Sequence, residues 1–357
     1  MNARGQGSRA RAGVALLAML FAASAMHAAV AATDPPAAVA DAPLAAMVHL
    51  SGGPSPDFPA TAAEVRAAAF DALAALSGAR GRLLADRGRT EDLIRRHRIR
   101  TGSSLTTEFL ADLRSETGAA TLLAVGLLAE DGRLAVSVRA IDTAGGRLAG
   151  LGLGEADPSA ATWRAALTEA IRQAYPEPTG TGGDAAPLLV LPARTVGLDA
   201  QVSRTATTCV LAEALAGGRW SALDPALVTG STTAAGHDLG LLDGEGRALV
   251  ARQCGVTWAV VPEVVSFDLL NEAAASREPV EADGGYRVRR VATLMVSLQL
   301  LDLRTGLVRG AVSAVFPGDP RVGWFGHVSQ PTELQQIRSA AAQLWEQFQR
   351  LLEEQNS

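Results

Sequence analysis

The chain has 357 residues, 48% of them hydrophobic, and a formal net charge of −5. This length is enough for two or three ordinary domains. The basic residues are all Arg and form no stripe, and aromatic residues are few, so the composition argues against a nucleic-acid-binding protein.

The first 32 residues have the pattern of a secretory signal peptide. Arginines precede an apolar run over residues 12–25, which is too short to span a bilayer comfortably. Small residues follow, and they predict cleavage near Ala31 and Ala32. An uncleaved membrane anchor is the alternative. No Cys follows the run and no later run could form an integral membrane segment, so we expect a periplasmic, soluble protein that is not a lipoprotein.

Two stretches rich in Pro, Ala and Gly punctuate the rest of the chain. Residues 33–43 are predicted to form a flexible tether, and residues 176–187 a Pro/Gly linker. They leave a first α/β domain at 44–175 and a second at 188–357.

The two predicted domains repeat the same order of elements. Gly81 and Gly118 recur as Gly218 and Gly255 with equal spacing, and each is expected to end a helix and begin a strand. The matched segments are opening strands at 45–50 and 188–193, helices at 62–76 and 206–216, and closing helices at 159–175 and 331–352. We therefore expect an α/β fold with α+β mixed sheets: two tandem, duplicated domains, each with a mixed β-sheet backed by helices.

The closest repeat within the chain is LAVSVRAIDTAGGRLAG, residues 134–150, against LMVSLQLLDLRTGLVRG, residues 294–310. Alternating apolar residues predict a hairpin with one buried face. Asp302 and Gly306 have the chemistry of a turn, which is the interpretation we adopt over a functional site.

Four segments of the second domain resemble a known group of periplasmic α/β domains. They are LLVLPA (188–193), GRWSALD (218–224), GVTWAVVPEVV (255–265) and LLDLRTGLVRG (300–310). The pattern resembles the amino-terminal domain of TolB and the curli-secretion protein CsgG, with the penicillin-binding-protein activator LpoB in the same structural group. The resemblance covers most of 188–350 and, through the duplication, 45–175 more weakly. It implies action on envelope machinery through protein contacts, without a catalytic residue.

An insertion at 266–290 replaces the tight Asp-Gly turn that joins the same two strands in the first domain. Long loops are commonly functional, so it is either a partner-binding loop or a solvated flap. A second loop at 316–330 carries aromatic residues that either anchor a partner or tuck beneath the final helix. The partner-binding candidates are Arg277, Tyr286, Arg287, Trp324 and Phe325.

Cys209 and Cys254 are the two cysteines, and they would share an oxidising compartment. A disulfide between them would close a loop of roughly 45 residues and stabilise the fold by on the order of 4 kcal/mol. Two buried thiols are the equal alternative, because sequence does not supply the Cα separation.

The sequence contains no motif for catalysis, for a metal or for a phosphate-binding cofactor. We therefore expect no enzymatic activity, no cofactor and no catalytic or metal-binding residues. The leading hypothesis is a non-enzymatic periplasmic adaptor or scaffold of a cell-envelope assembly or regulatory machine, with envelope proteins as partners. The alternatives are an oligomeric, CsgG-like component of an outer-membrane secretion system and a periplasmic hydrolase with an unrecognised site.

Overall fold

The structure is a computed structural model that describes most of the chain after residue 41. The described residues are 42–51, 61–79, 81–99, 105–130, 133–156, 160–175, 185–196, 198, 200–216, 218, 220–234, 244–267, 275–279, 286–290, 293–316, 321–322, 328–329 and 333–356. The predicted signal peptide, its cleavage sites at Ala31 and Ala32, and most of the predicted tether and linker lie outside them.

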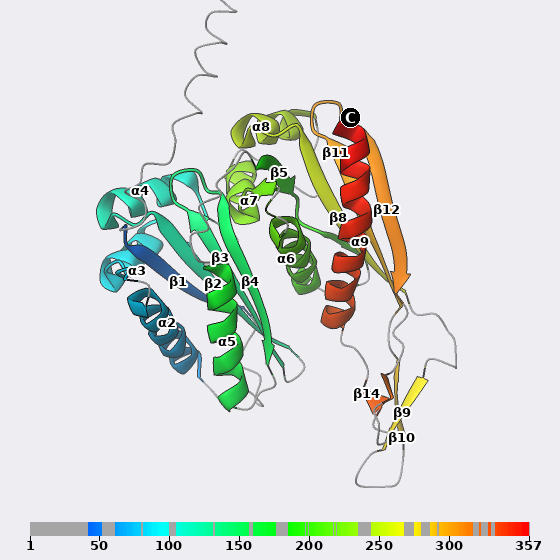
Figure 1. The fold of residues 1–357 in the computed structure, drawn as a ribbon, viewed down its shortest axis with the longest axis horizontal. Coiled ribbons are helices and arrows are strands. Elements are labelled where there is room, and N and C mark those ends of the chain that lie inside the picture. Colours follow the sequence, from blue (N-terminus) through cyan, green and yellow to red (C-terminus); the bar gives the residue numbers. More distant parts are fainter. Residues whose placement is uncertain are drawn as a thin grey trace, which may run out of the picture. The chain divides into compact units, whose positions relative to one another are not determined.

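The first half of the chain forms a four-stranded mixed sheet with helices on both faces (Figure 1). The strand order is β1-β2-β3-β4, in which β1 is parallel to β2 and the other neighbours are antiparallel. Its elements are β1 (Leu44–Ser51), α2 (Ala62–Ala79), α3 (Arg87–Arg96), α4 (Thr107–Thr117), β2 (Thr121–Glu130), β3 (Arg133–Asp142), β4 (Leu148–Ala156) and α5 (Ala160–Ala174).

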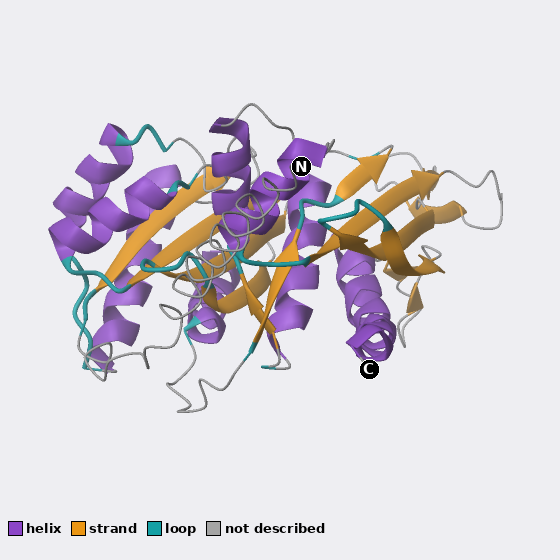
Figure 2. Ribbon diagram, turned by 90° about the horizontal axis from the view of Figure 1, so that it is seen from above, coloured by secondary structure: helices purple, strands orange, loops and turns teal. Residues whose placement is uncertain are grey.

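The second half forms a six-stranded mixed sheet, along which the C-terminal helix α9 runs (Figure 2). The order is β12-β11-β8-β5-β7, and β6 also pairs with β8. Its elements are β5 (Ala186–Val190), β6 (Arg194–Val196), α6 (Ala200–Ala216), β7 (Trp220–Ala222), α7 (Pro225–Ala234), α8 (Gly244–Cys254), β8 (Trp258–Phe267), β11 (Thr293–Asp302), β12 (Val308–Phe316) and α9 (Glu333–Asn356). Two small hairpins are separate: β9 (Ala275–Pro279) with β10 (Tyr286–Arg290), and β13 (Arg321–Val322) with β14 (Val328–Ser329).

The two sheets repeat one topology, as the sequence predicts. Parallel β5 and β8 correspond to β1 and β2, and the antiparallel strands β11 and β12 correspond to β3 and β4. β7 pairs with β5 on the side away from β8. At the matching position of the first half, Leu84 makes an isolated parallel bridge to Leu44 of β1. The expected fold, duplicated mixed sheets backed by helices, is confirmed. The domain boundaries remain a prediction, since Pro43–Ser357 forms one contact unit.

The predicted turns are also confirmed in both halves. The Asp142 and Asp302 carboxylates each accept hydrogen bonds from two backbone N–H groups ahead of them. Gly146 and Gly306 close the turns at φ of 67° and 75°, in the left-handed region that Gly adopts without a Cβ clash. A register shift occurs at the equivalent point of both hairpins, just before each Asp. The repeated sequence therefore specifies a repeated backbone.

Three apolar clusters hold the layers together. One lies between the first sheet and helices α2 and α5, and includes Leu73 and Trp163. Another lies between the second sheet and helices α7 and α8, and includes Val228 and Val250. The largest joins the other face of the first sheet, with α3 and α4, to α6, α9 and the other face of the second sheet. The two halves therefore share a continuous apolar core.

The disulfide alternative is wrong, because both cysteines are free. Neighbouring residues of a strand point to opposite faces of a sheet. Leu188 lies in the cluster that holds Cys209 of α6, whereas Leu189 lies in the cluster against which Cys254 of α8 packs. The two thiols therefore lie on opposite faces of the second sheet, and a bridge would have to cross it.

Candidate functional site

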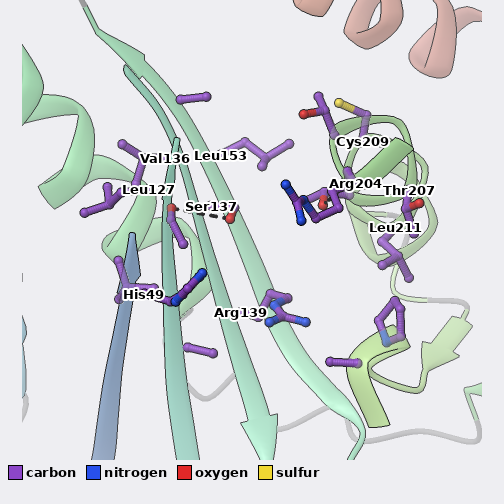
Figure 3. A pocket seen from close by; sticks show the side chains of 18 of the residues that line it. His49, Leu127, Val136, Ser137, Arg139, Leu153, Arg204, Thr207, Cys209 and Leu211 are labelled. Atoms are coloured by element: carbon purple, nitrogen blue, oxygen red, sulfur yellow. Dashed lines mark hydrogen bonds between the residues drawn. The ribbon is translucent and has the colours of Figure 1, made fainter. Parts of the chain in front are cut away.

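A cavity of about 370 Å³ lies between the first sheet and helix α6 (Figure 3). One wall is the face of strands β1 to β4 that points away from α2 and α5. The opposite wall is α6, with contributions from α7 and α9. Its lining includes the side chains of Met47, His49, Ser137, Arg139, Leu153, Glu155, Arg204, Thr208, Leu211 and Arg338.

The apolar part of the cavity comes from both walls. Met47 and Leu153 project from the first sheet, and Leu211 is a buried residue of α6. Gly126 also lines the wall, between His49 and Ser137 on the neighbouring strands. A Cβ at this position would lie 2.7 Å from the Ser137 Oγ, so the absence of a side chain makes room for the Ser137 hydroxyl.

An ion pair with a fully buried carboxylate joins the two halves. Arg139 of β3 donates from Nη1 to both Asp224 carboxylate oxygens, at 2.8 and 2.9 Å. Asp224 is fully buried and also accepts from the backbone N–H of Ala226 in the first turn of α7. Burial raises the pKa of the Asp224 carboxyl, against the lowering effects of Arg139 and the hydrogen bonds. Further contacts between the halves run from Arg147, whose guanidinium donates to the Ser221 hydroxyl at 2.8 Å.

The electrostatic character of the cavity is positive. Three Arg side chains line it, and Glu155 is the one acidic residue of its lining. Burial lowers the pKa of His49, and the nearby Arg204, Arg66 and Arg139 lower it further. His49 is therefore held neutral at pH 7, and the charge at the cavity comes from guanidinium groups.

The second sheet carries the equivalent face, and there part of it is exposed. In the first sheet, the row His49, Gly126, Ser137 and Leu153 runs across the four strands behind α6. The register of the second sheet places Arg194, Glu263, Ser297 and Ser313 in the matching row. The next row is apolar and consists of Val196, Val265, Met295 and Val315. We call these two rows of the second sheet the open face.

The side chains of the open face confirm its exposure. Val196 and Val315 are each 55% exposed, and Met295 is 36% exposed. On the strand between them, Glu263 accepts hydrogen bonds from the side chains of Ser297 and Gln299. Within the described residues, the cluster that α7 and α8 form with this side of the sheet includes Ala259, Val261 and Leu303, toward its other end.

The residues that the sequence nominated for partner binding lie on the insertion at 266–290 and on the loop at 316–330. Arg277 lies on β9, and Tyr286 and Arg287 lie on β10 of the insertion, where Arg287 pairs with Glu278 in the strand register. Trp324 and Phe325 fall outside the described residues. Their role in partner binding therefore stays a prediction.

Sequence reasoning missed the cavity, and the duplication contained the signal that could have found it. Arg139 and Gln299 occupy the same position of the repeated hairpin, as the quoted segments already show. A charged residue that differs between otherwise matching strands marks a place where the two halves have different surroundings. Within the described residues, no group of three or more His, Cys, Asp or Glu could hold a metal ion. In the same part of the chain, no helix is long and apolar enough to cross a membrane.

Comparison with known proteins finds partial matches among solved structures. No protein-family model and no curated protein matches the chain. The lipoprotein GNA1162 of Neisseria meningitidis is 15% identical, over 37% of this chain and 80% of its own, with a TM-score of 0.26. The LpoB C-terminal domain of Escherichia coli is 15% identical, over 39% of this chain and 88% of its own, with a TM-score of 0.25. PelC, a dodecamer from Paraburkholderia phytofirmans, is 12% identical, over 45% of this chain and 86% of its own, with a TM-score of 0.26. Scores this low support no argument about function.

Proposed function

We propose that this protein is a non-enzymatic adaptor or scaffold of a cell-envelope assembly or regulatory machine, acting in the periplasm through protein contacts. The observation that carries the proposal is the open face of the second sheet. The predicted signal peptide supports the compartment, and the sequence motifs of the TolB, CsgG and LpoB group support the class of process.

The equivalent face of the first sheet indicates what kind of surface the open face can bind. There, helix α6 packs against strand β4, faces the other strands across the cavity and contributes the buried Leu211. On the second sheet the same backbone presents an apolar row with polar groups beside it. A partner helix with an apolar stripe would fit such a face as α6 fits its counterpart, which is the helix-docking mode of recognition. The partner we propose is therefore an envelope protein that supplies such a helix.

The experiment is a crosslinked pull-down from intact envelopes with the mature protein and two variants of the open face. Met295→Asp and Val315→Asp place a charge in the apolar row, whereas Arg172→Gln changes an exposed residue of α5 as a matched control. We expect a discrete set of envelope proteins that is lost with both face variants and kept with the control. Capture that is unchanged by the face variants, or a turnover activity of the purified protein, would contradict the proposal.

A companion variant tests the insertion that carries Arg277, Tyr286 and Arg287. Replacing residues 268–288 by Asp-Gly gives the second hairpin the short turn of the first. If the insertion contributes to docking, capture weakens although the open face is intact. If capture is unchanged, the insertion is a solvated flap and the open face acts alone.

A second candidate is the oligomeric component, and one observation favours it. Helices α2 and α6 occupy the same place in the duplicated fold, and each ends just before a matched Gly, Gly81 or Gly218. The outward residues Ala67 and Asp71 of α2 are exposed, so this helix of a second copy is free to dock on the open face. Capture of the chain by itself in the pull-down, lost with Met295→Asp, would favour this candidate.

A further inference from the structure

The cavity between the first sheet and α6 has apolar walls and is lined by three arginines, of which one is paired with a carboxylate. The Arg139 guanidinium is committed to Asp224, as described above. Within the described residues, by contrast, the side chains of Arg204 and Arg338 make no hydrogen bond or ion pair. Both belong to exposed residues that line the cavity, one on α6 and one on α9. A ligand with a negative group would supply the missing partner for at least one of them.

Most hydroxyl groups on the α6 wall are already used within the protein. Thr208 donates to the Arg204 carbonyl at 2.6 Å, and Thr207 donates to the Ser203 carbonyl at 2.7 Å. Ser137, on the sheet wall, is only weakly engaged, because its Oγ lies 3.5 Å from the Gly126 carbonyl oxygen. A polar ligand therefore has few uncommitted partners here besides the guanidinium groups and Ser137.

The rest of the lining is suited to an apolar body. Met47 and Leu153 lie on the sheet wall of the cavity, and Leu211 lies on the α6 wall. A volume of about 370 Å³ lies within the range of small-molecule sites, which are mostly apolar with a few placed polar groups. A short, fully polar anion would leave these apolar walls unfilled.

We propose that the cavity binds a small organic anion with an apolar body, for which a medium-chain carboxylate is the simplest probe. The carboxylate pairs with Arg204, and the chain lies against Met47, Leu153 and Leu211. A ligand in this position touches both halves of the molecule, so its binding would hold the first sheet against α6. The cavity and the open face use different residues, so either can be functional without the other.

The test is isothermal titration of the purified mature protein with decanoate, below its micelle concentration. Decyltrimethylammonium has the same chain with the opposite charge, and acetate has the same charge without the chain. We expect saturable binding of decanoate, at least tenfold weaker binding of each comparison ligand, and about one site per chain. Equal binding of both decyl compounds, or no binding of decanoate, would overturn the proposal.

Two variants locate the site. Arg204→Gln removes a cation from an exposed position and should weaken decanoate binding about tenfold or more, since a charge-assisted contact is worth at least that factor. Arg172→Gln, an exposed substitution outside the cavity, should leave binding unchanged. Ser137→Phe places a large side chain on the cavity wall and should abolish binding. If Ser137→Phe does not fold, the Arg204 variant alone decides, and unchanged affinity in it would refute the assignment.

Discussion

The same face of a duplicated sheet has two different surroundings in this molecule. In the first sheet, the row through His49 and Ser137 is covered by α6 and borders a cavity. In the second sheet, the matching row is exposed at Arg194 but buried at Ser297, and the apolar row beside it is exposed at Val315. Because topology and register are the same, the difference arises from what packs on the face and not from the face itself.

The comparison indicates how tandem copies of one fold acquire separate roles. The first copy packs this face of its sheet against the second copy. An ion pair between Arg139 and the fully buried Asp224 is part of that contact. The matching face of the second copy is partly exposed, at Val196, Met295 and Val315. Side chains have diverged accordingly: Leu153 of the covered row corresponds to Ser313 of the open row.

The largest effect is expected from breaking the covered side. Arg139→Leu leaves the fully buried Asp224 carboxylate without its cation. Loss of one partner of a buried pair costs about 3–5 kcal/mol, because the remaining charge is uncompensated. Urea unfolding should show this loss in the free energy of unfolding. Arg172→Ala is the control, since it breaks an exposed ion pair with Glu169, for which less than about 1 kcal/mol is expected.

A smaller effect should follow from shortening one side chain of helix α6, which covers the first sheet. Leu211→Ala removes a side chain that is 1% exposed and lies against the cavity. Buried Leu→Ala substitutions cost about 2–5 kcal/mol, and we expect the lower part of that range, because the side chain already borders a void. Val315→Ala on the open face should change the free energy of unfolding by about 0.5 kcal/mol or less. Comparable losses for both variants would show that the two faces do not differ in packing.

The turn of the second hairpin should give a pH-dependent effect. Burial raises the pKa of Asp302, but hydrogen bonds from Thr305, Arg309 and Arg304 outweigh it and bring the pKa to about 2. A carboxyl with a lower pKa in the folded state stabilises the fold above its unfolded pKa of about 3.9, and this stabilisation is lost as pH falls toward 2. Asp302→Asn should therefore cost roughly 1–3 kcal/mol at pH 7, from weakened turn and Arg309 bonds.

The same variant should approach the parent protein in stability as the pH is lowered from about 4 to 2. Urea unfolding at pH 7 and through this acidic range measures both parts. A difference between variant and parent that does not change with pH would contradict the assignment of the low pKa to Asp302.

The smallest effect concerns the two thiols, which lie on opposite faces of the second sheet. Burial raises the pKa of Cys209 to about 12 and that of Cys254 to about 11. Both should react slowly with a thiol reagent in the native protein at pH 8, with Cys254 the faster because it is less buried. The unreduced, denatured chain should take up two labels. No labelling of that chain would mean that a disulfide is present after all.

The fold could be predicted from the sequence because its signals are local and repeated. The four glycines that end helices, Gly81, Gly118, Gly218 and Gly255, all have positive φ, and the Asp-Gly turns form in both halves. Such signals depend on a few neighbouring residues. The disulfide alternative failed because it depended on which face of the second sheet each helix covers.

The candidate site was not predictable in the same way, because it depends on how the halves pack. Arg139 and Asp224 are 85 positions apart in the sequence, and neither belongs to a recognisable motif. The exposure of Met295 could not be predicted from the sequence of its strand either. The alternation of Leu294, Val296 and Leu298 predicts one buried face but does not show whether the other face is covered. A face becomes a cavity wall or a free surface only through tertiary packing.

The most direct measurement is photocrosslinking in intact cells from a photoreactive amino acid placed at position 295, with position 172 as the control. If the open face is the docking surface, position 295 gives a discrete crosslinked product with an envelope protein or a second copy of the chain, and position 172 does not. If position 295 gives no product above that of position 172, the open face is not occupied in the cell, and the adaptor account fails at its centre.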